Sequence, residues 1–187
     1  MTDTARCFGS GDALMEEYHD HEWGKPVRGE AALLERIILE GFQSGLSWRT
    51  ILHKREALNR AFADFDPPTL AAFTEQDVTR LLHDASIVRN RRKIEAAITN
   101  ARAVVALHEA GRSLTDIVWS HAPVDPRPTP VYRLEDTPTQ TEESASLARD
   151  LKSHGFVFVG PVTMYAMMQA CGLVNDHLEG CLALQAS

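Results

Sequence analysis

The 187-residue sequence predicts an all-α protein. In most segments apolar residues recur at intervals of three and four, which is typical of the buried face of an amphipathic helix. We find no sustained alternation of apolar and polar residues with β-branched side chains, the pattern typical of strands. With 44% apolar residues the chain can bury one core. We therefore expect a single domain over 1–187, or two small helical lobes that share that core.

Three helices are predicted in the first third of the chain. Asp12 is suited to cap the first helix, which extends to about Glu22. Residues 29–41 repeat apolar positions at helical spacing and form the second. Ser47 is suited to cap the third, over 48–63.

Further helices are predicted along the rest of the chain. Pro67-Pro68 suits the first turn of a short helix, and Thr74 with Asp77 forms a near capping box for the next one. Between 121 and 141, five prolines predict an irregular connection, which is a candidate boundary between lobes. The predicted helices cover about 67–73, 74–84, 90–110, 113–120, 142–153 and 161–171.

Composition and charge exclude several classes of protein. No run approaches the ~18 apolar residues needed to span a bilayer, and the start of the chain does not resemble a secretory signal, so we expect a cytoplasmic protein without a membrane partner. The net charge of −7 argues against indiscriminate coating of nucleic acid but allows a local basic face. Three cysteines without disulfide-rich spacing favour reduced thiols or metal ligation. Nothing indicates more than a monomer.

The segment 37–48 places one carboxylate, that of Glu40, among apolar and aromatic residues. Burying a charge is costly unless the charge is paired, so Glu40 would be neutralised, paired, or reserved for a cationic ligand. The alternative is that Glu40 is a solvated residue in the last turn of a helix that ends at Gly41.

Four potential metal ligands lie near the two ends of the chain: Cys7 and His19 near the start, and His177 and Cys181 near the end. Two thiolates and two imidazoles complete a tetrahedral zinc shell. The second pair is spaced by four, so on a helix both side chains would share a face. A closed shell would hold the chain ends together without doing chemistry. The alternative is that Cys7 is a thiol without a function and that His177 and Cys181 are ordinary residues at a helix end.

Residues 154–160 connect two predicted helices in a tight helix-hairpin-helix. Gly155 suits the left-handed position that ends the first helix, and Pro161 suits the first turn of the second. Because Gly160 leaves the backbone uncovered, amides at the start of the second helix could bind a DNA phosphate. Similar hairpins also occur in folds that never touch DNA. The basic run 89–93 is a second candidate DNA contact or a solvated face.

Five motifs together resemble the DNA-3-methyladenine glycosylase I family. They are YHD with EWG at 18–24, LEGFQSGLSW at 39–48, IVRNRRKI at 87–94, GFVFVG at 155–160, and MQACGLVNDH at 168–177 with the cysteine at 181. They stand in family order and cover nearly the whole chain. The resemblance implies an all-helical DNA repair enzyme of the helix-hairpin-helix superfamily. Its activity would be hydrolysis of the N-glycosidic bond of 3-methyladenine in double-stranded DNA, which releases the base and leaves an abasic site.

The resemblance also implies roles for individual residues. Glu40 would be the catalytic group, and Leu46 would fill the gap left by a flipped nucleotide, unless it is a core leucine. Gly155 and Gly160 would contact the DNA. The pocket for the excised base would be lined by Tyr18, Trp23, Phe42 and Trp48. One structural zinc would be bound by Cys7, His19, His177 and Cys181.

The chain departs from the family pattern at three places. Many relatives have a tryptophan where Gly9 stands, so one pocket wall would be missing or supplied by Phe8. Glycine is common at the position of Ser86, which affects the turn before the basic run. The catalytic aspartate of the wider superfamily has Asp176 as its nearest match, and we leave that residue out of catalysis. From another class of function, the alternative is a catalytically silent, zinc-containing helical module that binds DNA or a modified purine.

Overall fold

The computed structural model describes residues 6–127 and 129–185. Within these ranges the fold is all-helical, as predicted, and extended backbone pairs only in an isolated bridge between Val131 and Leu178. No helix in the described part of the chain is long and apolar enough to cross a membrane. The α-helices are α1 (Ala13–His21), α2 (Glu30–Gln43), α3 (Trp48–Ala61), α4 (Pro67–Ala71), α5 (Glu75–His83), α6 (Arg91–Glu109), α7 (Leu114–Ser120), α8 (Glu142–Ser153), α9 (Pro161–Ala170) and α10 (Leu182–Gln185). Two 3₁₀ turns are η1 (Ala63–Phe65) and η2 (Leu134–Asp136).

The predicted capping residues begin the helices they were assigned to. The Asp12 carboxylate accepts hydrogen bonds from the first amides of α1, and the Ser47 hydroxyl accepts one from Thr50 in α3. Before α5, the Asp77 carboxylate accepts from the backbone amide of Thr74 at 2.9 Å. Because each cap satisfies an amide that the helix itself leaves unpaired, these local signals place helix starts reliably.

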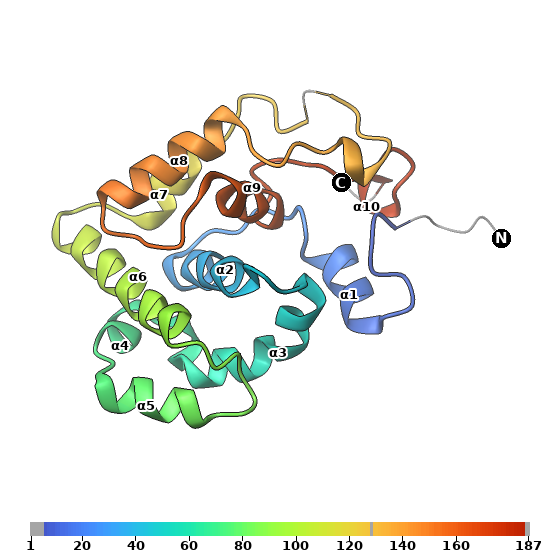
Figure 1. The fold of residues 1–187 in the computed structure, drawn as a ribbon. Coiled ribbons are helices and arrows are strands. Elements are labelled where there is room, and N and C mark those ends of the chain that lie inside the picture. The colour runs from blue at the N-terminus through green and yellow to red at the C-terminus, as the bar shows by residue number, and fades with distance from the viewer. Residues whose placement is uncertain (1–5, 128, 186–187) are drawn as a thin grey trace.

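Helix α2 lies at the centre of the molecule and packs against α3, α6, α7 and α9 (Figure 1). All of its residues from Leu33 to Phe42 are buried. The predicted helix end at Gly41 is wrong, since the helix continues to Gln43 and the chain turns at Gly45, where φ is +79°. Glu40 therefore lies in the last turn of α2, facing protein rather than solvent.

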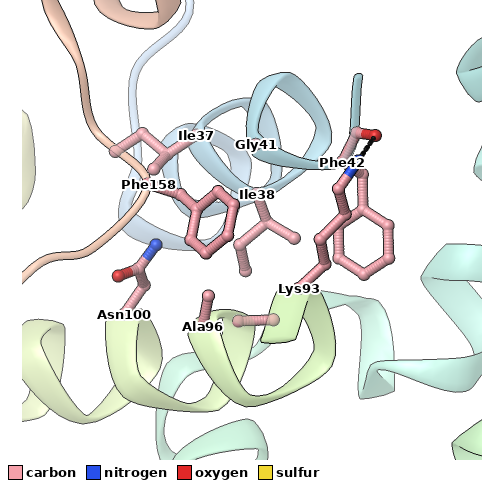
Figure 2. A pocket seen from close by; sticks show the side chains of 9 residues that line it. Ile37, Ile38, Gly41, Phe42, Lys93, Ala96, Asn100 and Phe158 are labelled. Carbon is pink, nitrogen blue, oxygen red and sulfur yellow. Dashed lines mark hydrogen bonds between the residues drawn. The ribbon is translucent and has the colours of Figure 1, made fainter. Parts of the chain in front are cut away.

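Lys93 closes the C-terminal end of α2 from the neighbouring helix α6. Its buried ammonium donates to the carbonyl of Phe42 at 2.7 Å (Figure 2). It also donates to the carbonyl of Ser44, at 2.6 Å. The last carbonyls of a helix lack partners within the helix and carry partial negative charge. The lysine ammonium therefore stabilises them both by donating hydrogen bonds and by its positive charge. This member of the predicted basic run is thus structural and does not face the solvent.

Replacing Lys93 should destabilise the protein measurably. We expect Lys93→Met to lower the free energy of unfolding by about 2–3 kcal/mol, because it leaves two carbonyls at the end of a buried helix without a donor. Urea unfolding measures this. Arg92→Met, on the exposed side of the same helix, is the matched control and should change stability by less than about 0.5 kcal/mol. Equal stabilities of the two variants would show that Lys93 does not hold this end of α2.

Helices α8 and α9 form the predicted hairpin and pack against each other. Gly155 has φ of +88°, as its predicted helix-ending position requires, and Pro161 begins α9. The buried amide of Asn100 in α6 holds the connection to the core. It donates to the Val157 carbonyl at 3.1 Å and accepts from the Val157 amide at 2.8 Å. The hairpin is therefore fixed relative to α6 and α2.

Candidate active site and metal site

A cavity of about 570 Å³ opens beside the end of α2. Its walls come from α1, α2, α3 and α9 and from the segment that includes η2. Four of the five side chains predicted for the active site line it, namely Glu40, Tyr18, Trp23 and Trp48. The remaining lining residues are Phe8, Met15, Gln43, Ser47, Arg49, Leu134, Thr137, Pro138, Thr139, Ala166 and Gln169.

The Glu40 side chain is the acidic group of this cavity. Only 6% of the residue is exposed, and within the described part of the chain its carboxylate accepts no hydrogen bond and forms no ion pair. Burial raises the pKa of Glu40 to about 8, while the positive charge of Arg36 opposes that rise. A carboxyl group that is buried, unpaired and accessible from a cavity is suited to a cationic ligand, because such a ligand supplies the missing partner.

Aromatic rings form the walls around Glu40. Tyr18 lies beside Trp48 with ring centroids 5.1 Å apart, and the edge of Phe8 meets Trp23, also at 5.1 Å. The Trp48 indole nitrogen is buried and has no hydrogen-bond partner. Flat apolar faces next to a carboxylate can sandwich a planar, positively charged ring.

Phe42 does not line the cavity, which corrects the prediction for this residue. Its ring packs edge-on against Phe62 in the core, with centroids 5.6 Å apart and 1% of Phe42 exposed. Two residues along a helix turn the side-chain direction by about 200°, so Phe42 must point away from the face that carries Glu40. With Lys93 and Phe158 it borders a gap of about 10 Å³ between α2 and α6, too small for a base (Figure 2).

A second cleft, of about 240 Å³, adjoins the first at Glu40. Leu46, from the turn after α2, and Val162, from the first turn of α9, line it and are 42% and 56% exposed. Leu46 is therefore not a core leucine. Gly160 is the residue before α9, and a Cβ there would meet only the Thr163 hydroxyl oxygen, at 3.9 Å, so the start of the helix is uncovered.

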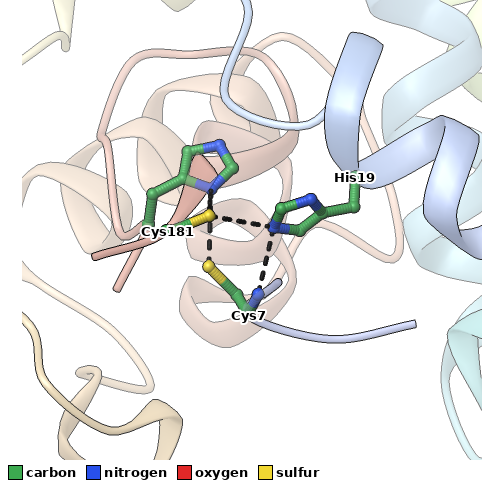
Figure 3. A group of neighbouring side chains, drawn as sticks. Cys7, His19 and Cys181 are labelled. Atoms are coloured by element: carbon green, nitrogen blue, oxygen red, sulfur yellow. Dashed lines mark hydrogen bonds between the residues drawn. The ribbon is translucent and has the colours of Figure 1, made fainter. Parts of the chain in front are cut away.

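The four predicted metal ligands meet at one point. The ligand atoms of Cys7, His19, His177 and Cys181 all lie within 4.8 Å of one another and are buried. The Cys181 sulfur is 3.4 Å from His19 Nε2 (Figure 3). The Cys181 and Cys7 sulfurs are each 3.5 Å from His177 Nδ1. Around a tetrahedral zinc ion with ordinary bond lengths, sulfur and nitrogen ligands stand about 3.5 Å apart. The donor set and its spacing thus fit a metal ion.

The ligands reach this arrangement differently from the predicted helical spacing. His177 and Cys181 lie in a non-helical segment that turns at 179–180, and α10 begins only after it. The bridge from Val131 to Leu178 and the hydrogen bond from the Leu178 amide to the Cys7 sulfur, at 3.2 Å, hold this segment in place. A turn brings the two side chains to one side as well as a helix would.

Neighbouring groups orient the two imidazoles. His19 Nδ1 lies 2.8 Å from Asp20, whose carboxylate also accepts from Arg6, and His177 Nε2 lies 3.2 Å from the Trp23 carbonyl. Each ring therefore turns its other nitrogen towards the cluster, as in histidine ligands of metals. Burial lowers the pKa of His177 to about 4, which keeps the ring neutral, the form that binds a metal.

Comparison with known proteins identifies the family. The profile of the methyladenine glycosylase family matches residues 8–184. The chain belongs to this family. It is 48% identical over 177 residues to DNA-3-methyladenine glycosylase 1 of Escherichia coli strain K12. The alignment covers 94% of this chain and 95% of the relative.

Solved glycosylase structures have the same fold. A crystal structure of 3-methyladenine DNA glycosylase I superimposes with a TM-score of 0.91 at 49% identity, covering 95% of this chain and 98% of that one. The Staphylococcus aureus enzyme, solved to explain its recognition of 3-methyladenine, gives a TM-score of 0.89 at 37% identity, with 95% and 94% covered.

The structure describes the three positions at which we expect the sequence to depart from the family pattern. Gly9 has φ of +91°, and a Cβ there would lie 3.0 Å from Met15, so this backbone leaves no room for a tryptophan. Phe8 supplies the wall instead. Ser86 does not need a glycine conformation, since its φ is not positive and its hydroxyl and amide bind Asp84. Asp176 accepts from Tyr165 and Gln169 and lies outside the Glu40 cavity.

Some residues around the site carried no readable signal in the sequence. Segment 134–139 closes one side of the cavity, although its prolines predicted only an irregular connection. Gln169 of α9 lines the cavity within a motif that we recognised but did not assign. Arg36 acts on Glu40 from one helical turn away, and only its helical spacing from Glu40 could have indicated this.

Proposed function

We propose that the chain is a monofunctional DNA glycosylase that removes 3-methyladenine from alkylated double-stranded DNA and leaves an abasic site. The main support for the proposal is the buried, unpaired carboxylate of Glu40, which lines an aromatic cavity. Relatives whose names specify this activity match nearly the full length of the chain, which supports the same assignment.

The chemistry of the lesion matches the cavity. Methylation at N3 gives adenine a positive charge within the nucleotide, so the damaged base is both a better leaving group and a better ligand for a carboxylate. Glu40 accepts a hydrogen bond from the base, while Tyr18 and Trp48 contact its faces. Unmodified adenine carries no charge and gains less from the same cavity. Selectivity therefore arises from the charge of the lesion.

Water is the nucleophile in this proposal. No lysine lines the Glu40 cavity within the described residues, so no amine is placed to form a covalent adduct with the sugar. Departure of the base gives the sugar oxocarbenium character, and water captures it. This supports hydrolysis of the glycosidic bond without strand cleavage.

The base must leave the duplex to reach Glu40, and the adjoining cleft suits that step. We propose that Leu46 enters the space left by the flipped nucleotide, because it is exposed beside the cavity entrance. Gly155 shapes the hairpin, and the uncovered amides after Gly160 bind a phosphate as part of a helix-hairpin-helix motif. Arg89 and Arg92 are exposed and without ion-pair partners in the described part of the chain, so they are further candidates for phosphate contacts.

The metal site fits one structural Zn²⁺ per chain. With four protein ligands the shell is closed, so the ion would link α1 and the segment before it to the segment before α10 and would not touch the substrate. We further propose that residues 1–187 form a single glycosylase domain, two helical lobes sharing one core with the cavity between them. It would act as a monomer in the cytoplasm.

The test is release of the base from methylated duplex DNA. We expect free 3-methyladenine by chromatography and abasic sites in the product, without strand breaks before alkali treatment. Release no faster than spontaneous depurination would refute the enzymatic proposal. In that case, salt-sensitive binding to a duplex with an abasic site, measured by fluorescence anisotropy, would favour a catalytically silent DNA-binding module.

The activity should depend on pH through Glu40. Burial raises the pKa of Glu40 to about 8, so below that pH the carboxyl group is protonated, neutral and a poorer partner for a cation. We expect kcat/KM for excision to rise with pH between about 7 and 9, with a midpoint near 8. Single-turnover measurements from pH 6 to 10, with enzyme in excess of the DNA but below saturation, test this. A flat profile over that range would contradict the role given to Glu40.

A further inference from the structure

Arg36 is a buried cation one helical turn before Glu40. Only 5% of the residue is exposed. Its Nη2 donates to the Glu22 carboxylate at 2.7 Å, whereas Nε and Nη1 are buried without a hydrogen-bond partner. Leaving donors of a buried cation unpaired is unfavourable, so a residue that does so needs an explanation beyond stability.

Arg36 belongs to a group of paired charges that does not include Glu40. Glu22 also accepts from Arg55 at 2.6 Å, and Arg55 in turn binds Glu35 at 2.8 Å. Two arginines and two carboxylates thus form one connected group with no net charge. Glu40 belongs to none of these pairs. When Glu40 is ionised, its charge is therefore the net charge of this group of five side chains.

Among the described residues, the other titratable groups near Glu40 are either neutral near pH 8 or already paired. Burial raises the pKa of Tyr18, from α1, well above its usual value, and raises that of Cys171, after α9, to about 12. Arg49, at the rim of the cavity, is paired with Asp12 at 2.6 Å. Arg36 is therefore the buried cation that acts on Glu40.

The position of Arg36 allows it to act without occupying the cavity. Residues four apart on a helix have Cβ atoms about 5–6 Å from each other, so the two charges are close. Yet no ion pair joins them, and the Arg36 guanidinium lies behind the wall, 6.0 Å from the centre of the Tyr18 ring. A direct ion pair would occupy the carboxylate and compete with a cationic base. Attraction through space does not.

We propose that Arg36 is a positioning residue that favours the ionised form of Glu40 and leaves its carboxylate free to receive a cationic base. Glu22 contacts only Nη2 of Arg36 and is shared with Arg55, so the guanidinium still attracts the Glu40 carboxylate and opposes the effect of burial on its pKa. The inference rests on the proposed function, because Arg36 acts through Glu40. At an effective dielectric constant of about 20, a charge at this separation shifts a titration by about one to two pH units.

The test is the pH profile of kcat/KM for excision by Arg36→Met, which keeps a long side chain and removes the charge. We expect the midpoint of the acid limb to move up by about one to two pH units, with the high-pH plateau within about threefold of the wild-type value. Arg36→Lys should restore most of the shift. Arg60→Met, an exposed substitution on α3, is the matched control and should leave the midpoint unchanged.

Glu22→Gln provides a second test of the role of Arg36 if Arg36→Met does not fold. Glu22→Gln removes the anion that compensates Arg36, so the midpoint should move to lower pH, in the opposite direction. Folding of each variant is checked by thermal melting. An unmoved midpoint in a folded Arg36→Met protein overturns the inference, as does a lowered plateau without a shift, which would show packing alone. Absence of release by the wild type at every pH would instead refute the proposed function.

Discussion

Glu40→Gln should lower the single-turnover rate of 3-methyladenine excision by about 100-fold or more. Glutamine keeps the size of the side chain and an oxygen that can accept a hydrogen bond, but it removes the charge that matches a cationic base. In a buried cavity, a charge–charge contact of this kind contributes about 3 kcal/mol or more, which corresponds to a rate factor of about 100. Glu109→Gln, at the exposed end of α6, is the control and should retain wild-type activity.

The same variant should be more stable than the wild type, which separates lost chemistry from lost folding. Burial raises the pKa of Glu40 above that of the unfolded chain, so ionised Glu40 destabilises the folded state once the pH exceeds the unfolded value. We expect Glu40→Gln to gain roughly 2–4 kcal/mol at pH 8–9, and we expect the gain to fade as the pH falls towards 4–5. Activity within fivefold of wild type, or a variant less stable than wild type at pH 8, would contradict this account.

Local signals in the sequence predicted the helices well because caps and apolar spacing act over a few residues. The side chains of Asp12 and Ser47 accept hydrogen bonds from amides a few residues away, and Gly155 adopts the positive φ that ends a helix. Their roles therefore follow from their neighbours in the sequence. The predicted end of α2, at Gly41, was wrong because a glycine after an apolar run resembles a helix cap. In the folded chain, Lys93 stabilises carbonyls beyond it instead. That contact joins residues about fifty positions apart and has no local pattern.

The candidate site was predicted more by motif than by geometry. Phe42 stands in the same motif as Glu40, but two residues along a helix place it on the opposite face. Arg36 shares the face of Glu40, yet its buried, partly unpaired state depends on Glu22 and Arg55, which lie on other segments. The metal ligands were recognised from their chemistry. Their meeting point depends on how the two chain ends pack, which spacing alone does not give.

Cys181→Ser should remove the metal and lower the melting temperature by about 10 °C or more. Cys171→Ser should keep the metal and lower the melting temperature by less. Both cysteines are buried near the end of the chain, so both substitutions place a hydroxyl at a buried position. Only Cys181 belongs to the four-ligand cluster. Elemental analysis of freshly purified protein should give about one zinc per chain for the wild type and Cys171→Ser, and well below one for Cys181→Ser.

Chelation and activity together test what the metal does. A strong chelator should lower the melting temperature of the wild type and of Cys171→Ser and leave that of Cys181→Ser unchanged, since the last has no ion to lose. Equal melting temperatures and zinc contents for the two variants would contradict the four-ligand site. Because His19 follows Tyr18 directly in α1 and the His177 ring contacts Trp23 at 4.6 Å, loss of the ion should also disturb two walls of the cavity. We therefore expect Cys181→Ser, assayed at a temperature where it remains folded, to lose affinity for 3-methyladenine while keeping the pH midpoint set by Glu40 and Arg36.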